Sequence, residues 1–115
     1  MKSIPSPAGA SAFRIREVPA SSDVQLRLVL SGSLDVDGAP SLMERLREIL
    51  KRGVIHVDLD FTEVSFVSSL GIGTLIAAIG EYREVQGDIG VGGLSKEILA
   101  VFEMLDLLDF VTLRS

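Results

Sequence analysis

Cysteine is absent from this chain of 115 residues, and histidine occurs only once, as His56. Without cysteine, the chain can form neither disulfide bonds nor a zinc site with thiolate ligands. With one histidine, a transition-metal site would have to consist mostly of carboxylates, and no stretch shows the spacing of such ligands. We therefore expect a protein without a bound metal or other cofactor.

Basic residues are also few, because 11 lysines and arginines stand against 16 acidic residues and give a formal net charge of -5. Nucleic acid binding needs concentrated lysine and arginine, so this balance argues against it and favours a protein partner. No apolar run reaches the roughly 18 residues of a membrane span. Residues 1–11 contain Pro5, Pro7 and Gly9 but no apolar run of the kind found in a signal peptide. These absences predict a cytoplasmic protein without membrane insertion.

The hydrophobic pattern alternates between the two-residue period of strands and the longer period of helices. We expect residues 1–11 to form a flexible tail and residues 12–115 to form a single domain. Predicted strands cover residues 13–18, 24–30, 54–61, 88–91 and 110–113. Predicted helices cover residues 39–50 and 95–105, and a further helix begins at residues 68–69 and ends within residues 80–87. The fold class is therefore α/β, with a mixed four- to five-stranded sheet and helices packed mainly on one face. The first two strands should form a hairpin, with a turn at residues 19–23, and residues 32–38 should form a loop.

Residues 54–79 organise the rest of the chain, because a strand pattern passes through a short loop into a helical pattern. Ser68 and Ser69 stand where the helix should begin, and a serine hydroxyl there can accept a hydrogen bond from the first turn. The unpaired N–H groups and the helix dipole also favour a phosphate at this place. Gly71 and Gly73 weaken the helix by roughly 1 kcal/mol each relative to alanine. They suggest a bare backbone that a partner can approach closely.

This stretch resembles the signature segment of a known family, the STAS domains of bacterial anti-sigma-factor antagonists. The usual form is Asp-Leu-x-x-Val-x-Phe-x-Asp-Ser-x-Gly-Leu-Gly, and this chain has Asp60-Phe-Thr-Glu-Val-Ser-Phe-Val-Ser-Ser-Leu-Gly-Ile-Gly-Thr-Leu75. Gly32-Ser-Leu-Asp35 is similar to the family's Gly-x-Leu-Asp segment, and residues 102–110 are similar to its closing helix and last strand. The resemblance covers about residues 13–113 and implies a single STAS-like domain.

The resemblance implies roles for individual residues. Ser69 aligns with the family's phosphorylated serine. Ser68 replaces the acidic residue that usually precedes it, and is the alternative phosphate acceptor or the helix cap. Asp35 matches an acidic loop residue near the phosphoserine, although a plain turn residue explains an aspartate there equally well. The expected partner-binding residues are Asp35, Ser68, Ser69, Leu70, Gly71, Ile72 and Gly73.

Catalytic interpretations of the same residues have less support. Ser69, His56 and Asp60 lack the Gly-x-Ser-x-Gly elbow of hydrolases, and the histidine lies in a strand. The glycine-rich residues 87–93 lack both the dinucleotide-binding spacing and a phosphate-loop lysine. Support of the loop is the simpler role for Asp60, and a helix cap is the simpler role for Ser69.

We therefore expect a non-enzymatic switch, as the resemblance implies. Unphosphorylated at Ser69, the protein would sequester an anti-sigma factor that has serine kinase activity, and a serine phosphatase would remove the phosphate. An added charge of about -1.5 to -2 would change the binding surface in both sign and volume. The alternative is a structural or regulatory STAS subunit of a larger assembly, such as a stressosome-like or lipid-transport complex.

Overall fold

The computed structural model describes residues 12–20 and 25–114. The predicted tail at residues 1–11, most of the predicted turn at residues 19–23 and the predicted strand start at Val24 lie outside the described residues. Strands and helices follow one another along the described chain in the predicted order. They are β1 (Arg14–Pro19), β2 (Leu26–Leu34), α1 (Gly38–Lys51), β3 (His56–Val67), α2 (Ser69–Glu84), β4 (Asp88–Gly92), α3 (Lys96–Met104) and β5 (Thr112–Arg114).

The described strands form one mixed sheet in the order β1-β2-β3-β4-β5. β1 pairs with β2 in antiparallel fashion, as predicted for a hairpin, whereas β2, β3, β4 and β5 run parallel to one another. A helix connects each pair of consecutive parallel strands, because the chain must return to the edge where the strands begin. All four parallel strands therefore end at the same edge of the sheet, which we call the carboxyl edge.

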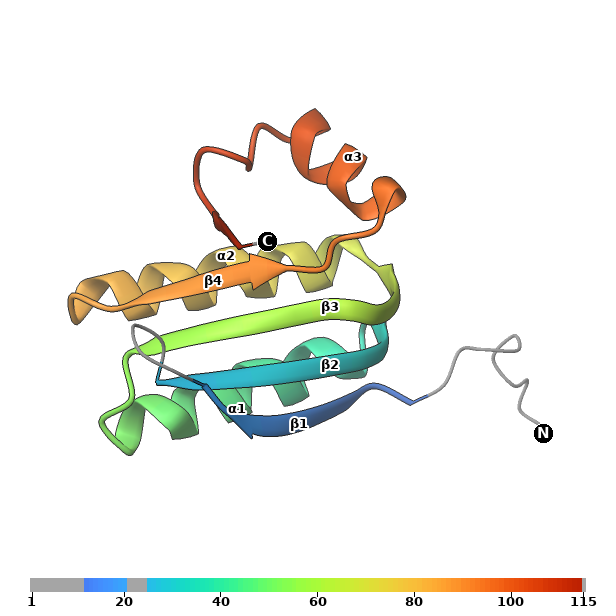
Figure 1. Cartoon of the computed structure of the whole chain (residues 1–115). Helices are drawn as coiled ribbons and strands as arrows, with labels where there is room; N and C mark the ends of the chain where they lie inside the picture. The colour runs from blue at the N-terminus through green and yellow to red at the C-terminus, as the bar shows by residue number, and fades with distance from the viewer. Residues whose placement is uncertain (1–11, 21–24, 115) are drawn as a thin grey trace.

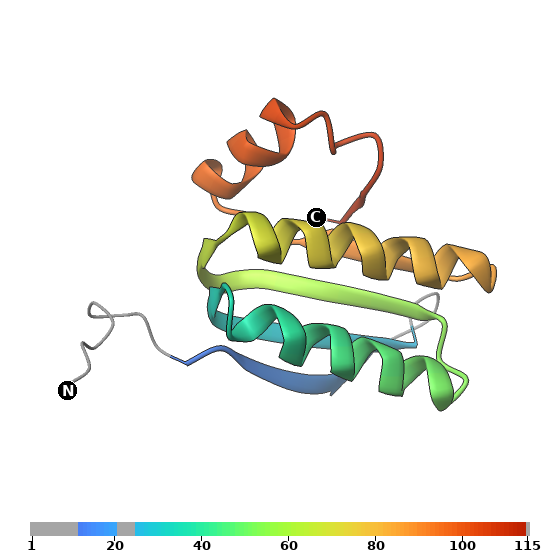
Figure 2. The same ribbon diagram turned by 180° about the vertical axis from the view of Figure 1, so that it is seen from behind.

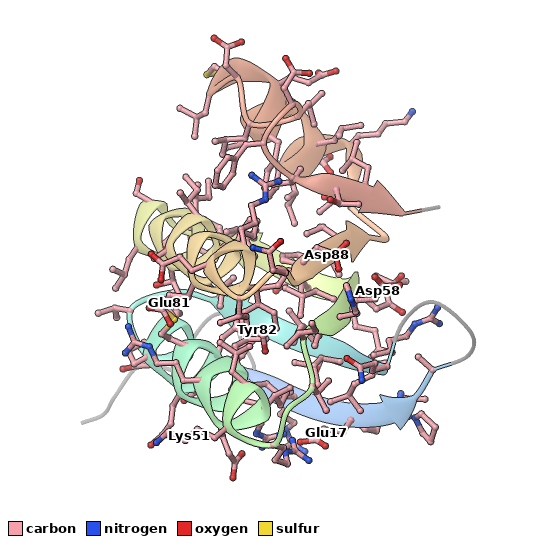
Figure 3. All side chains as sticks on the ribbon, turned by 90° about the vertical axis from the view of Figure 1, so that its left-hand side faces the viewer. Glu17, Lys51, Asp58, Glu81, Tyr82 and Asp88 are labelled. Carbon is pink, nitrogen blue, oxygen red and sulfur yellow. The ribbon has the colours of Figure 1, made fainter. Side chains whose placement is uncertain are left out.

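The helices lie mainly on one face of the sheet, as predicted. Figures 1 and 2 show α1 and α2 side by side on this face, with α3 next to α2 beyond β4. In Figure 3, Tyr82 lies on the helix side of the sheet, whereas Asp58 and Asp88 lie on the side away from α1 and α2. No described helix covers that opposite face, which faces the viewer in Figure 1 and which we call the open face.

The core fills the space between the sheet and the helices. Its best-buried side chains, each exposed by 1% or less, include Leu28, Leu30, Leu34, Val57, Leu59 and Phe61 from the strands and Leu42, Leu46, Ile49, Leu75, Ile79 and Phe102 from the helices. Tyr82 is also buried, and its hydroxyl donates to the backbone C=O of Leu46 at 2.7 Å. Burial raises the pKa of Tyr82 well above its ordinary value, so this hydrogen bond holds α2 against α1 with a neutral phenol.

Two strands are longer than the sequence pattern predicts. β2 continues to Leu34, so residues 32–34 belong to a strand instead of a loop. β3 continues to Val67, and no loop separates it from α2. The pairing of β2 with β3 shifts register twice between Val29 and Ser33. Such shifts let the ladder continue past points where the alternation of apolar residues breaks down.

The C-terminal part of the chain also differs from the prediction. β5 covers Thr112–Arg114 instead of residues 110–113. In α3, Ile98 and Phe102 are buried, but Val101 and Leu105, which the helical period places in the same apolar stripe, are exposed by 37% and 52%. A short helix at the border of the sheet has only one side covered by the core, so part of its apolar stripe faces outward.

Candidate functional site

The ends of β2 and β3 meet at the carboxyl edge. Leu34 and Val67, the last residues of the two strands, are paired with each other. The backbone N–H of Ser68 donates to the C=O of Leu34 at 2.9 Å. Asp35 and Ser68, which follow the paired residues, therefore begin side by side. The predicted proximity of the Asp35 loop to the start of the second helix is confirmed.

Ser68 is the N-cap of α2. Its backbone is extended, with φ -85° and ψ 172°, and its Oγ accepts a hydrogen bond from the Gly71 N–H at 3.1 Å. The same hydroxyl donates to the Leu34 C=O at 3.3 Å. The cap is therefore Ser68 and not Ser69, which is the first residue inside the helix.

Ser69 is exposed in the first turn of α2. Within the described chain its hydroxyl makes no hydrogen bond. The first turn of a helix carries unpaired N–H groups and the positive end of the dipole, so a negative group attached here would be stabilised. The Ser69 hydroxyl is thus accessible to a modifying enzyme, in a place that tolerates a phosphate.

Replacing Ser68 with alanine should lower the free energy of unfolding by about 1 kcal/mol, because the helix loses its cap. Ser69→Ala should change it by less than about 0.5 kcal/mol, since the exposed hydroxyl supports no structure. Ser95 caps α3 in the same way, accepting from the Ile98 N–H at 3.2 Å, so Ser95→Ala is the reference for a lost cap. Urea denaturation measures all three variants. Equal losses for Ser68→Ala and Ser69→Ala would contradict this assignment.

The two glycines of the first turns of α2 have different surroundings. Gly71 is buried, and a Cβ atom added there would lie 2.4 Å from the Leu34 carbonyl oxygen and 3.1 Å from Cγ1 of Val67. Gly73 is exposed, and a Cβ atom added there would meet nothing within 4 Å. The expectation of a bare backbone open to a partner is therefore wrong for Gly71, which lets α2 approach the end of β2. For Gly73 it stays a prediction.

The carboxylate of Asp35 is engaged by its own turn. Its Oδ1 accepts from the backbone N–H of Asp37 at 3.1 Å and of Gly38 at 3.2 Å. Its backbone C=O accepts from the Ala39 N–H at 2.8 Å, which begins α1. These bonds favour the turn interpretation of Asp35. Partner binding by Asp35 stays a prediction, and the half-buried side chain lies at the carboxyl edge where such binding would occur.

Only part of the predicted partner surface is exposed. Leu70 is 48% exposed, next to Ser69, but Ile72 is only 6% exposed and belongs to the interior. Phe66, near the end of β3, is 54% exposed and adds apolar surface at the same edge. The sequence pattern missed Phe66 because its stretch reads as a loop. The available indication was an aromatic residue two positions before the serine pair.

His56 lies far from this edge. It begins β3, and its Nδ1 is 2.7 Å from Oδ1 of Asp88 at the start of β4. The length of β3 separates His56 from Ser69 by roughly 35 Å, so the two cannot share a catalytic site. In residues 12–20 and 25–114, no three acidic or histidine side chains gather as metal ligands. None of the helices described there is long and apolar enough to cross a membrane.

Asp60 lies near the middle of β3, and its carboxylate binds Thr62, two residues further along the strand. Its Oδ1 accepts from the Thr62 N–H at 2.9 Å and from the Thr62 hydroxyl at 2.6 Å. Gly93 follows β4 with a left-handed φ of +71°, and a Cβ atom added there would lie 2.7 Å from the same Oδ1. This close packing gives Asp60 a structural role. The hydrogen bond from the Thr62 hydroxyl holds the pKa of Asp60 below its ordinary value.

Acid should weaken the contribution of Asp60 to the stability of the fold in a defined pH range. Because the pKa is lower in the folded state, the stabilisation is complete above the ordinary value of 3.8 and is lost as the pH falls through the lower folded value. Thr62→Val removes the main hydrogen bond and should raise the pKa of Asp60 toward 3.8. NMR titration of the Asp60 carboxyl carbon measures this shift, with Thr112→Val on β5 as the control. An unchanged Asp60 pKa in Thr62→Val would refute the assignment.

The sequence of this domain matches a family model described as "Mlab, STAS domain" over residues 18–113. The match includes the ends of β2 and β3, the serine pair and all of α2 and α3. The chain belongs to the STAS family. The resemblance noted from the serine pair and its neighbours is thereby confirmed, as is the α/β fold with a five-stranded mixed sheet.

Curated and solved relatives of the STAS domain include antagonists of anti-sigma factors. The anti-sigma-B factor antagonist of Listeria monocytogenes is 28% identical over 88 residues, which cover 76% of this chain and 77% of the relative. Solved structures of the anti-sigma factor antagonist SpoIIAA match with TM-scores of 0.66 for the unphosphorylated form and 0.67 for the phosphorylated form of the Bacillus protein. Their identities are 19% and 20%, and the matches cover 90% of this chain and 88% and 92% of those chains. At such identities the structures establish a shared fold.

Proposed function

We propose that this STAS protein is an anti-sigma-factor antagonist that binds an anti-sigma factor while Ser69 is unphosphorylated and releases it when Ser69 is phosphorylated. The main support is the exposed Ser69 in the first turn of α2, whose hydroxyl makes no hydrogen bond within the described residues, since Ser68 forms the cap. Relatives from Listeria monocytogenes and Bacillus subtilis that are named anti-sigma-B factor antagonists support the same conclusion. The protein acts by binding and not by catalysis, in the cytoplasm.

The surroundings of Ser69 explain how a phosphate can change binding without unfolding the domain. The helix N-terminus stabilises a negative group attached to Ser69, so the modified protein keeps its fold. Leu70 and Phe66 are exposed apolar side chains at the same edge, and a partner that covers them removes water from Ser69 as well. A hydrated dianion in such an interface carries a desolvation penalty that opposes binding.

The proposal needs two enzymes besides the protein. The anti-sigma factor itself would be the serine kinase, because it must already contact the surface around Ser69. A serine phosphatase would restore the unmodified hydroxyl. Partner binding is assigned to the carboxyl edge, where Asp35, Ser69, Leu70 and Gly73 lie.

The test begins with capture of partners on the immobilised wild-type protein, followed by their identification. The expected partner is an anti-sigma factor, which is then purified and incubated with this protein and ATP. Phosphate should be incorporated into wild type, peptide mapping should locate it on Ser69, and Ser69→Ala should incorporate none. Label on Ser68 or Thr74 would overturn the assignment. Capture of a membrane transport complex or a large sensory assembly instead would support the structural-subunit alternative.

A further inference from the structure

A groove of about 240 Å³ opens at the carboxyl edge next to the start of α2. It lies between the end of β3, the first turn of α2 and α3. Its lining is mostly apolar, with one carboxylate, and includes Phe66, Val67, Ile72, Ile98, Val101 and Glu97. Phe66 and Ile72 lie three residues before and after Ser69, so the groove borders the proposed phosphorylation site.

Exposed apolar side chains continue this lining on both sides. Phe66 is 54% exposed on the β3 side, and Val101 is 37% exposed on the α3 side. Met104, three residues after Val101 and on the same helical face, is 79% exposed. Exposed apolar side chains along a groove mark a surface that a partner covers.

The size of the groove indicates what it can hold. Its volume is below the roughly 300 to 1,000 Å³ of pockets that enclose small-molecule ligands. It is an open groove along a helix and has room for one or two side chains. An apolar anchor residue of a protein partner, inserted between Phe66 and Val101, fits this shape.

The charge of the groove indicates the chemistry of that partner. Glu97 lines the groove and is exposed in the first turn of α3. The segment to which it belongs, residues 96–109, has one lysine against four acidic residues. A carboxylate beside an apolar groove is complementary to lysine and arginine and repels the anionic surface of a membrane.

We propose that this groove is a second contact region for the protein partner, in which a large apolar side chain is inserted and neighbouring lysine or arginine residues meet Glu97. The inference rests on the proposed function in taking the anti-sigma factor as that partner. A partner side chain bound in the groove lies directly beside Ser69. The affinity of the partner then depends both on this apolar contact and on the phosphate at Ser69.

Two pairs of variants test the groove against matched positions at the other end of α2. Val101→Glu is compared with Val85→Glu, because Val85 is a similarly exposed valine outside the groove. Glu97→Lys is compared with Glu84→Lys, which reverses the same charge at the last residue of α2. The Kd for the captured anti-sigma factor should rise at least about fivefold for Val101→Glu and about threefold for Glu97→Lys. Both controls should stay within about twofold of wild type.

The result separates this inference from the proposed function. If Ser69→Asp weakens binding while Val101→Glu binds as wild type does, the groove is not part of the interface and the switch stands. If Ser69→Asp has no effect while Val101→Glu weakens binding, the switch fails and the groove stands.

A random peptide library displayed on phage tests the groove without the anti-sigma factor. Selection on wild type should enrich peptides with a large apolar residue next to lysine or arginine, and these should fail to bind Val101→Glu. Peptides without basic residues, or with equal binding to Val101→Glu, would overturn the proposal. Circular dichroism of each variant shows that it is folded.

Discussion

Ser69→Asp is expected to raise the Kd for the anti-sigma factor about thirtyfold, which corresponds to roughly 2 kcal/mol of binding free energy. The variant places a carboxylate where Leu70 and Phe66 present apolar surface, and the partner would have to desolvate it. Ser69→Ala should bind within about twofold of wild type, because the exposed hydroxyl makes no hydrogen bond in the part of the chain that the structure describes. Isothermal titration calorimetry with the purified partner measures both affinities.

Unfolding cannot account for the expected loss, because Ser68 is the cap. Ser69→Asp adds a favourable charge at the helix N-terminus and should keep the free energy of unfolding within about 0.5 kcal/mol of wild type or raise it. Ser41 is exposed in the first turn of α1, so Ser41→Asp adds the same charge at the start of a different helix. Binding by Ser69→Asp that matches wild type, or an equal loss for Ser41→Asp, would show that Ser69 is not the switch.

Gly71→Ala should destabilise the fold by about 1 to 3 kcal/mol, the range found for overpacked positions. The added Cβ atom would lie 2.4 Å from the backbone carbonyl oxygen of Leu34 and 2.9 Å from its Cγ. Neither contact is with the flexible end of a side chain, so the first turn of α2 must move away from β2. This shift would also displace Ser68 and Ser69, and we expect weaker partner binding in addition to lower stability.

Gly73→Ala is the matched control for this substitution, two residues further along the same helix. Its Cβ atom meets nothing within 4 Å, so the change should raise stability by up to about 1 kcal/mol through helix propensity. Urea denaturation of both variants should therefore give shifts of opposite sign. Shifts of the same sign and size would mean that propensity, and not the contact with Leu34, decides the outcome at Gly71.

The order of strands and helices could be predicted from the sequence because each element carries its own period. The strand ends could not, because the ladder between β2 and β3 passes two register shifts where the alternation is interrupted. The prediction of one apolar stripe on α3 was incomplete for a related reason. Periodicity shows which residues share a helical face, but it does not show that the core covers Phe102 and leaves Leu105 exposed.

The serine pair at a helix start was identified from sequence, but which of the two serines caps the helix was not. Both serines are chemically able to cap the helix, and only the backbone conformation shows that Ser68 does so. The roles of the two glycines could not be predicted for the same reason. Gly71 and Gly73 are alike in the sequence, and only the structure shows that Leu34 packs against Gly71 and that no described part of the chain packs against Gly73. The groove could not be predicted, because it depends on where α3 packs against β3 and α2.

The double hydrogen bond between Ser68 and the Leu34 carbonyl bears on how quickly the protein can respond. The backbone N–H and the hydroxyl of Ser68 both donate to this one oxygen, at 2.9 and 3.3 Å, and thereby fix the residue before Ser69 to the sheet. A phosphate added to Ser69 therefore meets a backbone that these two hydrogen bonds already hold in place. In the proposed switch, no slow rearrangement of the chain delays the change of state. Its response time would then equal the turnover time of the kinase and the phosphatase.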